Sequence, residues 1–511
     1  MFKGFKKKNK TIHSTNQSHT PNTPLVRSLD SNIESIKHLI GHSPDVVMHS
    51  FKMGSSGKAA ILVYIKGLVN EKTIYEQIIK SIMLELPKIE ALADPGSKEE
   101  KMKDAVLMIT QSKEVQTLEE CIEYVLAGDS ALFIEGSNEA LVFSTQGWEK
   151  RTPEEPPSEP TIRGPRDGFI ETIYENIVLL RRRIRDPNFT IIEYKMGRRT
   201  KAELMIVYIK GIANQQLVDE VKRRIERIDI DAVIATGYVE QLIEDNFLSP
   251  FPQIIATERP DKVVGALMEG RVGILLDNTP YALIVPVTFP MFMQTPEDYY
   301  ERWMYSSFIR LLRYLTISVA LFLPAFYVAL ISFNQGLLPT QLTVSIAATR
   351  EGVPFPSFVE ALIMEITLEI LREAGVRLPK PIGQAIGIVG GLVIGEAAVQ
   401  AGIVSPIMVI VVALTGVSSF AIPQYSLGIA IRVLRFFMMI LAGTLGLYGI
   451  MLGFIIITVH MVKLKSFDTN YTAPFVPYRS KDWKDFIIRM PMMNMKQRPE
   501  MMKTQDKQRK S

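Results

Sequence analysis

The hydrophobic pattern divides this chain of 511 residues into two unlike parts. Up to about residue 300, short apolar runs alternate with charged stretches, which predicts α/β structure with solvent-facing surfaces. Nearly every long apolar run falls between Leu311 and Val462. A helix that crosses a bilayer needs roughly 20 apolar residues, and we place such spans at 314–333, 382–400, 404–422 and 436–462. The pattern therefore predicts a soluble α/β region followed by an all-α, multi-pass transmembrane domain.

Between the first two spans lies a helix-like segment that carries acids where a membrane anchor would carry leucine. On a helix that starts at Pro356, Glu365 and Glu369 share an arc of about 100° with Arg372 and Glu373. Carboxylates near membrane depth are expensive, so they usually face water, a partner or one another. This arc is therefore the part of the chain where we expect function.

Two interpretations of the acidic helix, 356–373, stay open. In the first, it lines an aqueous pore formed by several copies of the chain, with a ring of carboxylates that attracts cations. The pore-lining candidates are then Phe358, Leu362, Glu365 and Glu369. In the second, it is an interfacial helix whose acids meet headgroup water, with Glu369 and Glu373 paired to Arg372 and Arg377. Glu360 falls on the opposite side of the helix.

Charge bias does not decide whether this helix is a fifth span. Cytoplasmic flanks of spans carry an excess of Lys and Arg. The basic residues of a C-terminal tail, 463–511, favour a cytoplasmic C-terminus, which together with a cytoplasmic N-terminal region demands an even number of spans. Four spans satisfy that condition but leave Arg372, Arg377 and Lys380 outside, whereas a fifth span brings them inside. We give the longer tail more weight.

Other residues of the membrane half are expected to pack helices or to mark the bilayer boundary. A glycine every fourth residue leaves one helix face free for close packing, and these glycines are Gly383, Gly387, Gly391 and Gly395. The expected membrane-interface residues are Trp303, Arg310, Arg313, Arg432 and Arg435. Long basic side chains near helix ends reach the headgroups. Pairing of Arg432 and Arg435 with the acids of 356–373 is the alternative.

The soluble half contains one unit twice. Ile61-Leu-Val-Tyr-Ile-Lys-Gly-Leu-Val-Asn70 is echoed by Met205-Ile-Val-Tyr-Ile-Lys-Gly-Ile-Ala-Asn214. In each copy a short apolar strand leads to a helix, so each copy is predicted to be a small α/β subdomain. The predicted organisation is a disordered basic tail (1–28), subdomain 1 (29–148), a Pro-rich linker (149–167), subdomain 2 (168–298), the transmembrane domain (299–462) and the C-terminal tail.

Composition and the motif search argue against several classes of function. The net charge of +4 is small for this length and the basic residues are interleaved with acids, so nucleic acid is not an expected partner. A lone cysteine, Cys121, leaves no intrachain disulfide framework. Gly54-Ser-Ser-Gly-Lys58 lacks the first glycine and the final Ser or Thr of a phosphate-binding loop. No metal-ligand spacing, cofactor motif or catalytic nucleophile is found, so we do not expect an enzyme.

Several motifs of the second half resemble those of one family, the A subunits of spore germinant receptors. They are Pro296-Glu-Asp-Tyr-Tyr300, Arg350-Glu-Gly-Val-Pro-Phe-Pro356, Leu371-Arg-Glu-Ala-Gly-Val-Arg-Leu-Pro379 and Pro381-Ile-Gly383, after an earlier Ile284-Val-Pro-Val-Thr-Phe-Pro290. The likeness is dense from Asp167 to about Tyr478.

The resemblance implies a multi-pass protein of the spore inner membrane with a cytoplasmic N-terminal region. It implies partnership with a transporter-like B subunit and a lipoprotein C subunit, and a homo-oligomeric, nutrient-gated cation channel. A non-conducting scaffold subunit is the alternative. A secondary transporter is disfavoured because transporters duplicate their membrane halves, whereas here the soluble half is duplicated. Ligand binding between the two repeats ranks below a coupling role for them.

Overall fold

The computed structural model describes residues 23–53, 57–85, 112–147, 155–378 and 393–509. The chain forms two compact units. One comprises Met1–Arg151 with Arg181–Ile191, and the other comprises Thr152–Leu180 with Ile192–Ser511. Most of the second α/β subdomain, the helical region and the C-terminal segment therefore belong to one unit.

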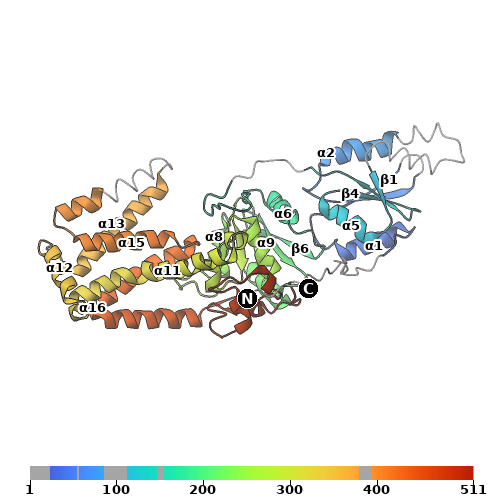
Figure 1. The fold of residues 1–511 in the computed structure, drawn as a ribbon. Coiled ribbons are helices and arrows are strands. Elements are labelled where there is room, and N and C mark those ends of the chain that lie inside the picture. Colours follow the sequence, from blue (N-terminus) through green and yellow to red (C-terminus); the bar gives the residue numbers. More distant parts are fainter. Residues whose placement is uncertain (1–22, 54–56, 86–111, 148–154, 379–392, 510–511) are drawn as a thin grey trace, which may run out of the picture. The chain divides into compact units, whose positions relative to one another are not determined.

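The first unit is built around an antiparallel sheet of five strands with helices on both faces (Figure 1). Its strands, in the spatial order β1-β2-β4-β5-β3, are β1 (Val46–Lys52), β2 (Ala59–Ile65), β3 (Ser112–Val115), β4 (Ser130–Ile134) and β5 (Ala140–Phe143). Its helices are α1 (Leu29–Leu39), α5 (Leu118–Ala127) and α2 (Glu71–Thr73), which continues through the π-helical turns Ile74–Ile79 and Ser81–Glu85. Side chains alternate across a strand. Leu62 and Tyr64 of β2 accordingly pack against the α2 run, which buries Ile74 and Ile78 on the same core.

The second subdomain repeats this topology. The spatial order of its strands is β6-β7-β9-β10-β8, which is the order of the first sheet shifted by five. The strands are β6 (Phe189–Met196), β7 (Ala202–Ile209), β8 (Ile255–Thr257), β9 (Val272–Leu276) and β10 (Ala282–Val285). The helices are α6 (Ile173–Arg181), α7 (Gln215–Glu226), α8 (Thr236–Ile243) and α9 (Pro260–Met268). The prediction of two similar α/β subdomains is confirmed.

The duplication extends to single hydrogen bonds. Asn70 caps α2, its side chain accepting from the backbone N–H of Lys72, and Asn214 caps α7 by accepting from Gln216. Asn32 donates its amide to the carbonyl of Val26 at 2.7 Å, and Asn176 does the same to Ile170 at 2.6 Å. An N-cap amide satisfies backbone donors that a helix leaves free. The asparagines that close the repeated sequence motif are therefore helix caps in both copies.

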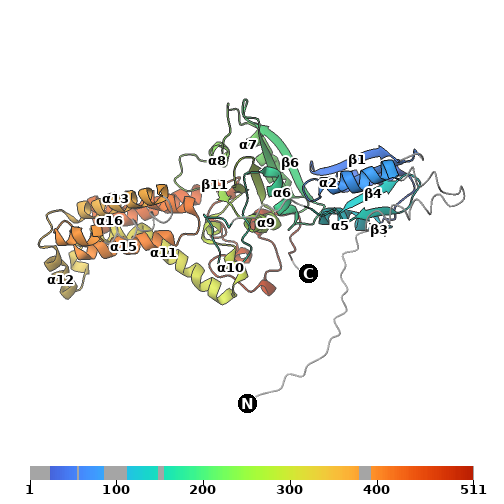
Figure 2. The ribbon, with the colours of Figure 1, turned by 90° about the horizontal axis from the view of Figure 1, so that it is seen from above.

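The helical region is an antiparallel bundle within the second unit. Its elements are α11 (Trp303–Ser332), α12 (Thr340–Arg350), α13 (Ser357–Arg377), the helical residues 393–400, α15 (Pro406–Phe420) and α16 (Tyr425–Lys463). Figure 2 shows α11, α13, α15 and α16 side by side, with α12 at the end remote from the sheet. In the described part of the chain, α11 and α16 are long and apolar enough to cross a membrane, and α15 is a shorter apolar helix. Much of the predicted span 382–400 lies outside the described residues.

The helix α16 is a hairpin rather than a single rod. Gly446 interrupts it with φ 60° and ψ −142°, a conformation that suits glycine. Beyond this turn, Gly449 lies against Leu441 and Gly453 against Met438, so the arm 447–463 folds back along the arm 425–445. The predicted single span 436–462 is therefore wrong in its course. Its glycines Gly446, Gly449 and Gly453 are where the chain turns and packs on itself.

The predicted C-terminal tail is folded. After α16 the chain forms the short strands β11 (Lys465–Ser466) and β12 (Thr469–Asn470). Phe467 and Met502 then join the hydrophobic core of the second subdomain. The backbone N–H of Gln505, near the C-terminus, donates to the carbonyl of Ile212 in the second subdomain at 3.2 Å. Both chain ends of the bundle therefore lie on the second subdomain.

The described part of the Pro-rich linker is also held in place. Arg259 is fully buried and its guanidinium donates to the carbonyls of Glu159 and Pro165 at 3.1 and 2.9 Å. Lys262 reaches Glu159 at 2.6 Å and the side chain of Gln424, which precedes α16, at 2.9 Å. The segment 155–167 is thus part of the second unit, not a free spacer.

Candidate functional site in the helical bundle

The acidic face of α13 turns toward the first arm of α16. Glu365 lies 2.9 Å from the guanidinium of Arg435, and both side chains are fully buried. Glu369, one turn further along, lies 3.0 Å from Arg435 and 3.2 Å from Arg372. Arg432 approaches Glu369 at 3.8 Å. Two carboxylates and three guanidiniums thus form one cluster, which we call the acid–arginine cluster.

Several buried polar atoms of the cluster make no hydrogen bond with the described residues. Both carboxylate oxygens of Glu365 lack a hydrogen-bond partner among the described residues, as do Nε and Nη1 of Arg435 and Nε of Arg372. Burying a charge is costly unless it is paired and hydrogen-bonded. These donors and acceptors can each still form a hydrogen bond with water or another polar group.

Glu360 belongs to a different site. Its carboxylate accepts from the backbone N–H and the hydroxyl of Ser405, each at 2.6 Å, and Arg350 approaches it at 3.4 Å. The hydroxyl of Ser405 also accepts from the N–H of Met408, which caps α15. Glu360 therefore braces the start of α15, and the sequence was right to separate it from the acidic arc.

The remaining pore-lining and packing candidates pack inside the bundle where they can be described. The ring of Phe358 lies over Gly443 of α16, where an added Cβ would be 2.7 Å from the ring. Leu362 is half-buried one turn further along α13. Gly395 is close to Val409 of α15, at 3.5 Å from an added Cβ. Gly383, Gly387 and Gly391 lie outside the described residues.

The arginines expected at the headgroups point inward instead. Arg435 is enclosed by the acid–arginine cluster, so pairing with α13, the alternative interpretation, describes it correctly. Arg310 is fully buried and bonds to Asp298 at 3.2 Å and Asp485 at 2.8 Å. Arg313 reaches the same Asp298 at 2.9 Å. The expectation of outward-reaching arginines is wrong for these three residues.

Helical spacing explains the reversal at α11. Ser306, Arg310 and Arg313 recur on one face, which meets the segment that carries Asp298, whereas Phe308 on the other side of the helix is exposed. The aspartates were missed because Asp298 was seen only as part of a family motif. Asp485 comes from the C-terminal segment, which the sequence suggested was a tail. Trp303 stays a candidate for the membrane interface.

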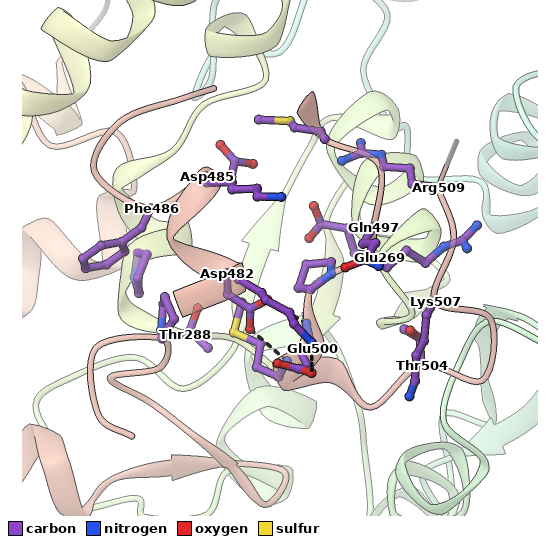
Figure 3. A pocket seen from close by; sticks show the side chains of 18 of the residues that line it. Glu269, Thr288, Asp482, Asp485, Phe486, Gln497, Glu500, Thr504, Lys507 and Arg509 are labelled. Atoms are coloured by element: carbon purple, nitrogen blue, oxygen red, sulfur yellow. Dashed lines mark hydrogen bonds and ion pairs between the residues drawn. The ribbon is translucent and has the colours of Figure 1, made fainter. Parts of the chain in front are cut away.

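A cavity of about 170 Å³ opens between the second subdomain and the C-terminal segment (Figure 3). Its lining includes Glu269, Arg271, Asp482, Glu500 and Arg509. Burial raises the pKa of Glu269 and lowers that of Arg271, and their mutual attraction at 3.6 Å opposes both shifts. The wall carries charges of both signs, so its geometry favours no one ligand class.

Comparison with known proteins decides the family. The sequence model of the Bacillus/Clostridium GerA spore germination protein family matches residues 34–501. The chain belongs to this family. Among the GerA family members, the spore germination protein GerLA of Bacillus cereus is 42% identical over 93% of this chain and 95% of its own. The spore germination protein KA of Bacillus subtilis (strain 168) is 43% identical over 94% of this chain and 88% of its own.

The chain is also similar to a protein named as a membrane protein and to a solved N-terminal domain. The uncharacterized membrane protein YfkQ of Bacillus subtilis (strain 168) is 43% identical over 93% of this chain and 91% of its own. The crystal structure of the N-terminal domain of the A subunit of the Bacillus megaterium spore germinant receptor GerK3 is 35% identical. It covers 52% of this chain and 98% of that domain, with a TM-score of 0.42. The family resemblance found in the sequence motifs is confirmed, and with it a role for this GerA family protein in spore germination.

Proposed function

We propose that the chain is the A subunit of a germinant receptor and that several copies form a nutrient-gated cation channel with Glu365 and Glu369 on its path. The observation that carries the proposal is the acid–arginine cluster. Ionisable side chains among apolar helices are expensive and mark ion or substrate pathways. The unused oxygens of Glu365 support a site that exchanges protein contacts for a hydrated ion.

The proposed placement has the bundle in the spore inner membrane and both flanks in the cytoplasm. The segment before α11 and the segment after α16 both pack on the second subdomain, which supports an even number of crossings. The hairpin in α16 contributes two of them. A transporter-like B subunit and a lipoprotein C subunit are the proposed partners, as the family resemblance implies.

We propose further that the described arrangement is closed. Arg435 covers Glu365 and contacts Glu369, so its positive charge occupies the place where a cation would bind. At close range in a medium of low dielectric, opposite charges attract strongly. A movement of the first arm of α16 away from α13 would uncover both carboxylates, and the Lys262 contact to Gln424 connects that arm to the linker.

A scaffold subunit that conducts nothing is the second candidate. One observation favours it: Glu365 faces another helix of its own chain rather than the outside of the bundle. In that case the cluster would hold α13 to α16, and the exposed apolar residues of α13, such as Ile366 and Ile370, would contact partner subunits or lipid.

Cation flux separates the two candidates. The chain is purified, its oligomeric state is measured, and it is reconstituted into liposomes with its partners as wild type, as Glu365→Gln/Glu369→Gln and as Glu373→Gln. Glu373 is the matched control because it is exposed and pairs only with Arg377 among the described residues. A channel predicts nutrient-dependent flux that the double variant loses and the control keeps. Equal flux from all three correctly assembled proteins, or a monomeric wild type, would contradict the channel.

A further inference from the structure

A loop of the second subdomain exposes two large apolar side chains in succession. Phe247 and Leu248, between α8 and β8, are 78% and 79% exposed. Burying side chains of this kind away from water is favourable. Two of them at the tip of one loop form an apolar surface that no described residue of the chain covers.

Hydrogen bonds hold the loop so that this tip points outward. Gln253 is buried and its side chain makes two bonds with the backbone of Asn246: its Oε1 accepts from the N–H at 2.9 Å, and its Nε2 donates to the carbonyl at 2.7 Å. The N–H of Leu248 donates to the side chain of Asn246 at 3.1 Å. The exposure of Phe247 and Leu248 is therefore a feature of a braced turn.

The same loop is fastened to the end of α16. Ser249, next to the tip, shares a hydrogen bond of 2.8 Å with Nε2 of His460, and the ring of Phe251 stacks on the His460 ring with centroids 6.1 Å apart. His460 lies in the last turn of the helix, just before Lys463. Up to that turn the arm 447–463 is apolar and exposes residues such as Phe454 and Val459. The apolar tip is thus hydrogen-bonded, through Ser249, to the last turn of α16, where the apolar sequence ends and Lys463 follows.

We propose that Phe247 and Leu248 insert into the bilayer at its interfacial region and anchor the second subdomain to the membrane surface. The occupant is lipid because the tip continues the apolar surface of α16 at its basic end, the position at which aromatic side chains favour the membrane–water boundary. The proposal depends on α16 crossing the membrane, and it is independent of conduction. Its consequence is that this unit contacts the lipid through a loop of the second subdomain as well as through the bundle.

Spin labels measure the depth of the tip directly. The variants Leu248→Cys, Phe247→Cys, Ile162→Cys and Phe454→Cys of the full chain are labelled with a nitroxide and reconstituted into liposomes. The native thiol does not compete, because Cys121 is buried and burial raises its pKa to about 12. Ile162 is 90% exposed in the linker and serves as the water reference, whereas Phe454 in α16 serves as the lipid reference.

The proposal predicts that labels at 247 and 248 collide more with oxygen than with a water-soluble nickel complex, as at 454 and opposite to 162. Nickel accessibility at 247 and 248 equal to that at 162, with 454 in lipid, overturns the anchor and leaves the membrane placement intact. If labels at 247 and 248 collide with neither oxygen nor the nickel complex, the tip contacts protein, and the lipid anchor is overturned. A water-exposed label at 454 overturns the anchor together with the proposed membrane placement.

Discussion

Arg435 of α16 lies 2.9 Å from Glu365 of α13, and neither side chain is exposed. The two residues are far apart in sequence, and each is the nearest opposite charge that the other meets inside an apolar bundle. The pair therefore connects the acidic helix to the hairpin whose ends rest on the second subdomain.

The stability of this connection should depend on removing both partners together. Arg435→Leu leaves the Glu365 carboxylate buried without compensation, and we expect a loss of about 3–5 kcal/mol, whereas Glu365→Leu/Arg435→Leu should recover most of it. Denaturant unfolding of the full chain in micelles measures both. Arg377→Leu, whose partner Glu373 is exposed, is the control and should cost ~0–1 kcal/mol. A double variant as unstable as the single one would contradict the pairing.

A second buried pair is expected to stabilise the first unit. Arg181 donates to Asp45 at 2.9 and 3.0 Å and to Ser43 at 2.8 Å, with both charged side chains buried. Arg181→Ala should lower the free energy of unfolding of this unit by about 3–5 kcal/mol. The exposed pair Arg198–Asp229 of the second unit offers the comparison, because Arg198→Ala should leave the exchange of β1 and β2 unchanged. Hydrogen exchange of β1 and β2 in the full chain reports the loss locally, and similar exchange in the two variants would contradict the account.

The turn of the α16 hairpin should tolerate only glycine. The φ of 60° at Gly446 strains any residue that has a Cβ. A Cβ at this position would also lie 2.8 Å from the Cβ of Phe333. Gly446→Ala should therefore destabilise the bundle by a few kcal/mol, of which strain contributes about 1–3. Gly428→Ala, at an open helical position of the same element, should be neutral or slightly stabilising. Thermal unfolding in micelles compares them. Equal melting temperatures would mean that residue 446 continues a straight helix.

Stability around α8 should rise as the pH falls through neutrality. Partial burial and the charge of Glu244 raise the pKa of Glu240 to about 7. An unfolded glutamate titrates near about 4.3. Between these values the folded state binds the extra proton, so the stability contributed by Glu240 is lost as pH rises from about 4.3 to 7. Hydrogen exchange of α8 at pH 5.5 and 8 should show this slope in the wild type and a weaker one in Glu240→Gln. An unchanged slope in the variant would assign the effect to another group.

Much of the fold could be predicted from local signals. The repeated strand and glycine–asparagine motif specified two similar subdomains because strand alternation and helix caps are encoded within a few residues. The separation of Glu360 from Glu365 and Glu369 followed from the helical period alone.

What failed depended on contacts between distant segments. Arg310 and Asp485 are separated by 175 positions, and no local pattern indicates that the chain after α16 returns to the second subdomain. The turn at Gly446 was hidden because helical glycines signal close packing whether the neighbour is another helix or the same chain reversed. Arg435 was ambiguous for a related reason: a basic residue near the end of an apolar run can face headgroups or an acid, and only the course of α16 decides which.

The central claim is that Arg435 keeps a cation path closed by covering Glu365 and Glu369. Unstimulated cation flux through liposomes that contain the assembled receptor tests it, with Arg435→Gln compared to Arg435→Gln/Glu365→Gln/Glu369→Gln and to Arg377→Gln as the exposed control. The account predicts that Arg435→Gln alone leaks cations without nutrient and that neutralising the two acids abolishes the leak. Flux from assembled Arg435→Gln that stays at the wild-type level without nutrient would contradict it.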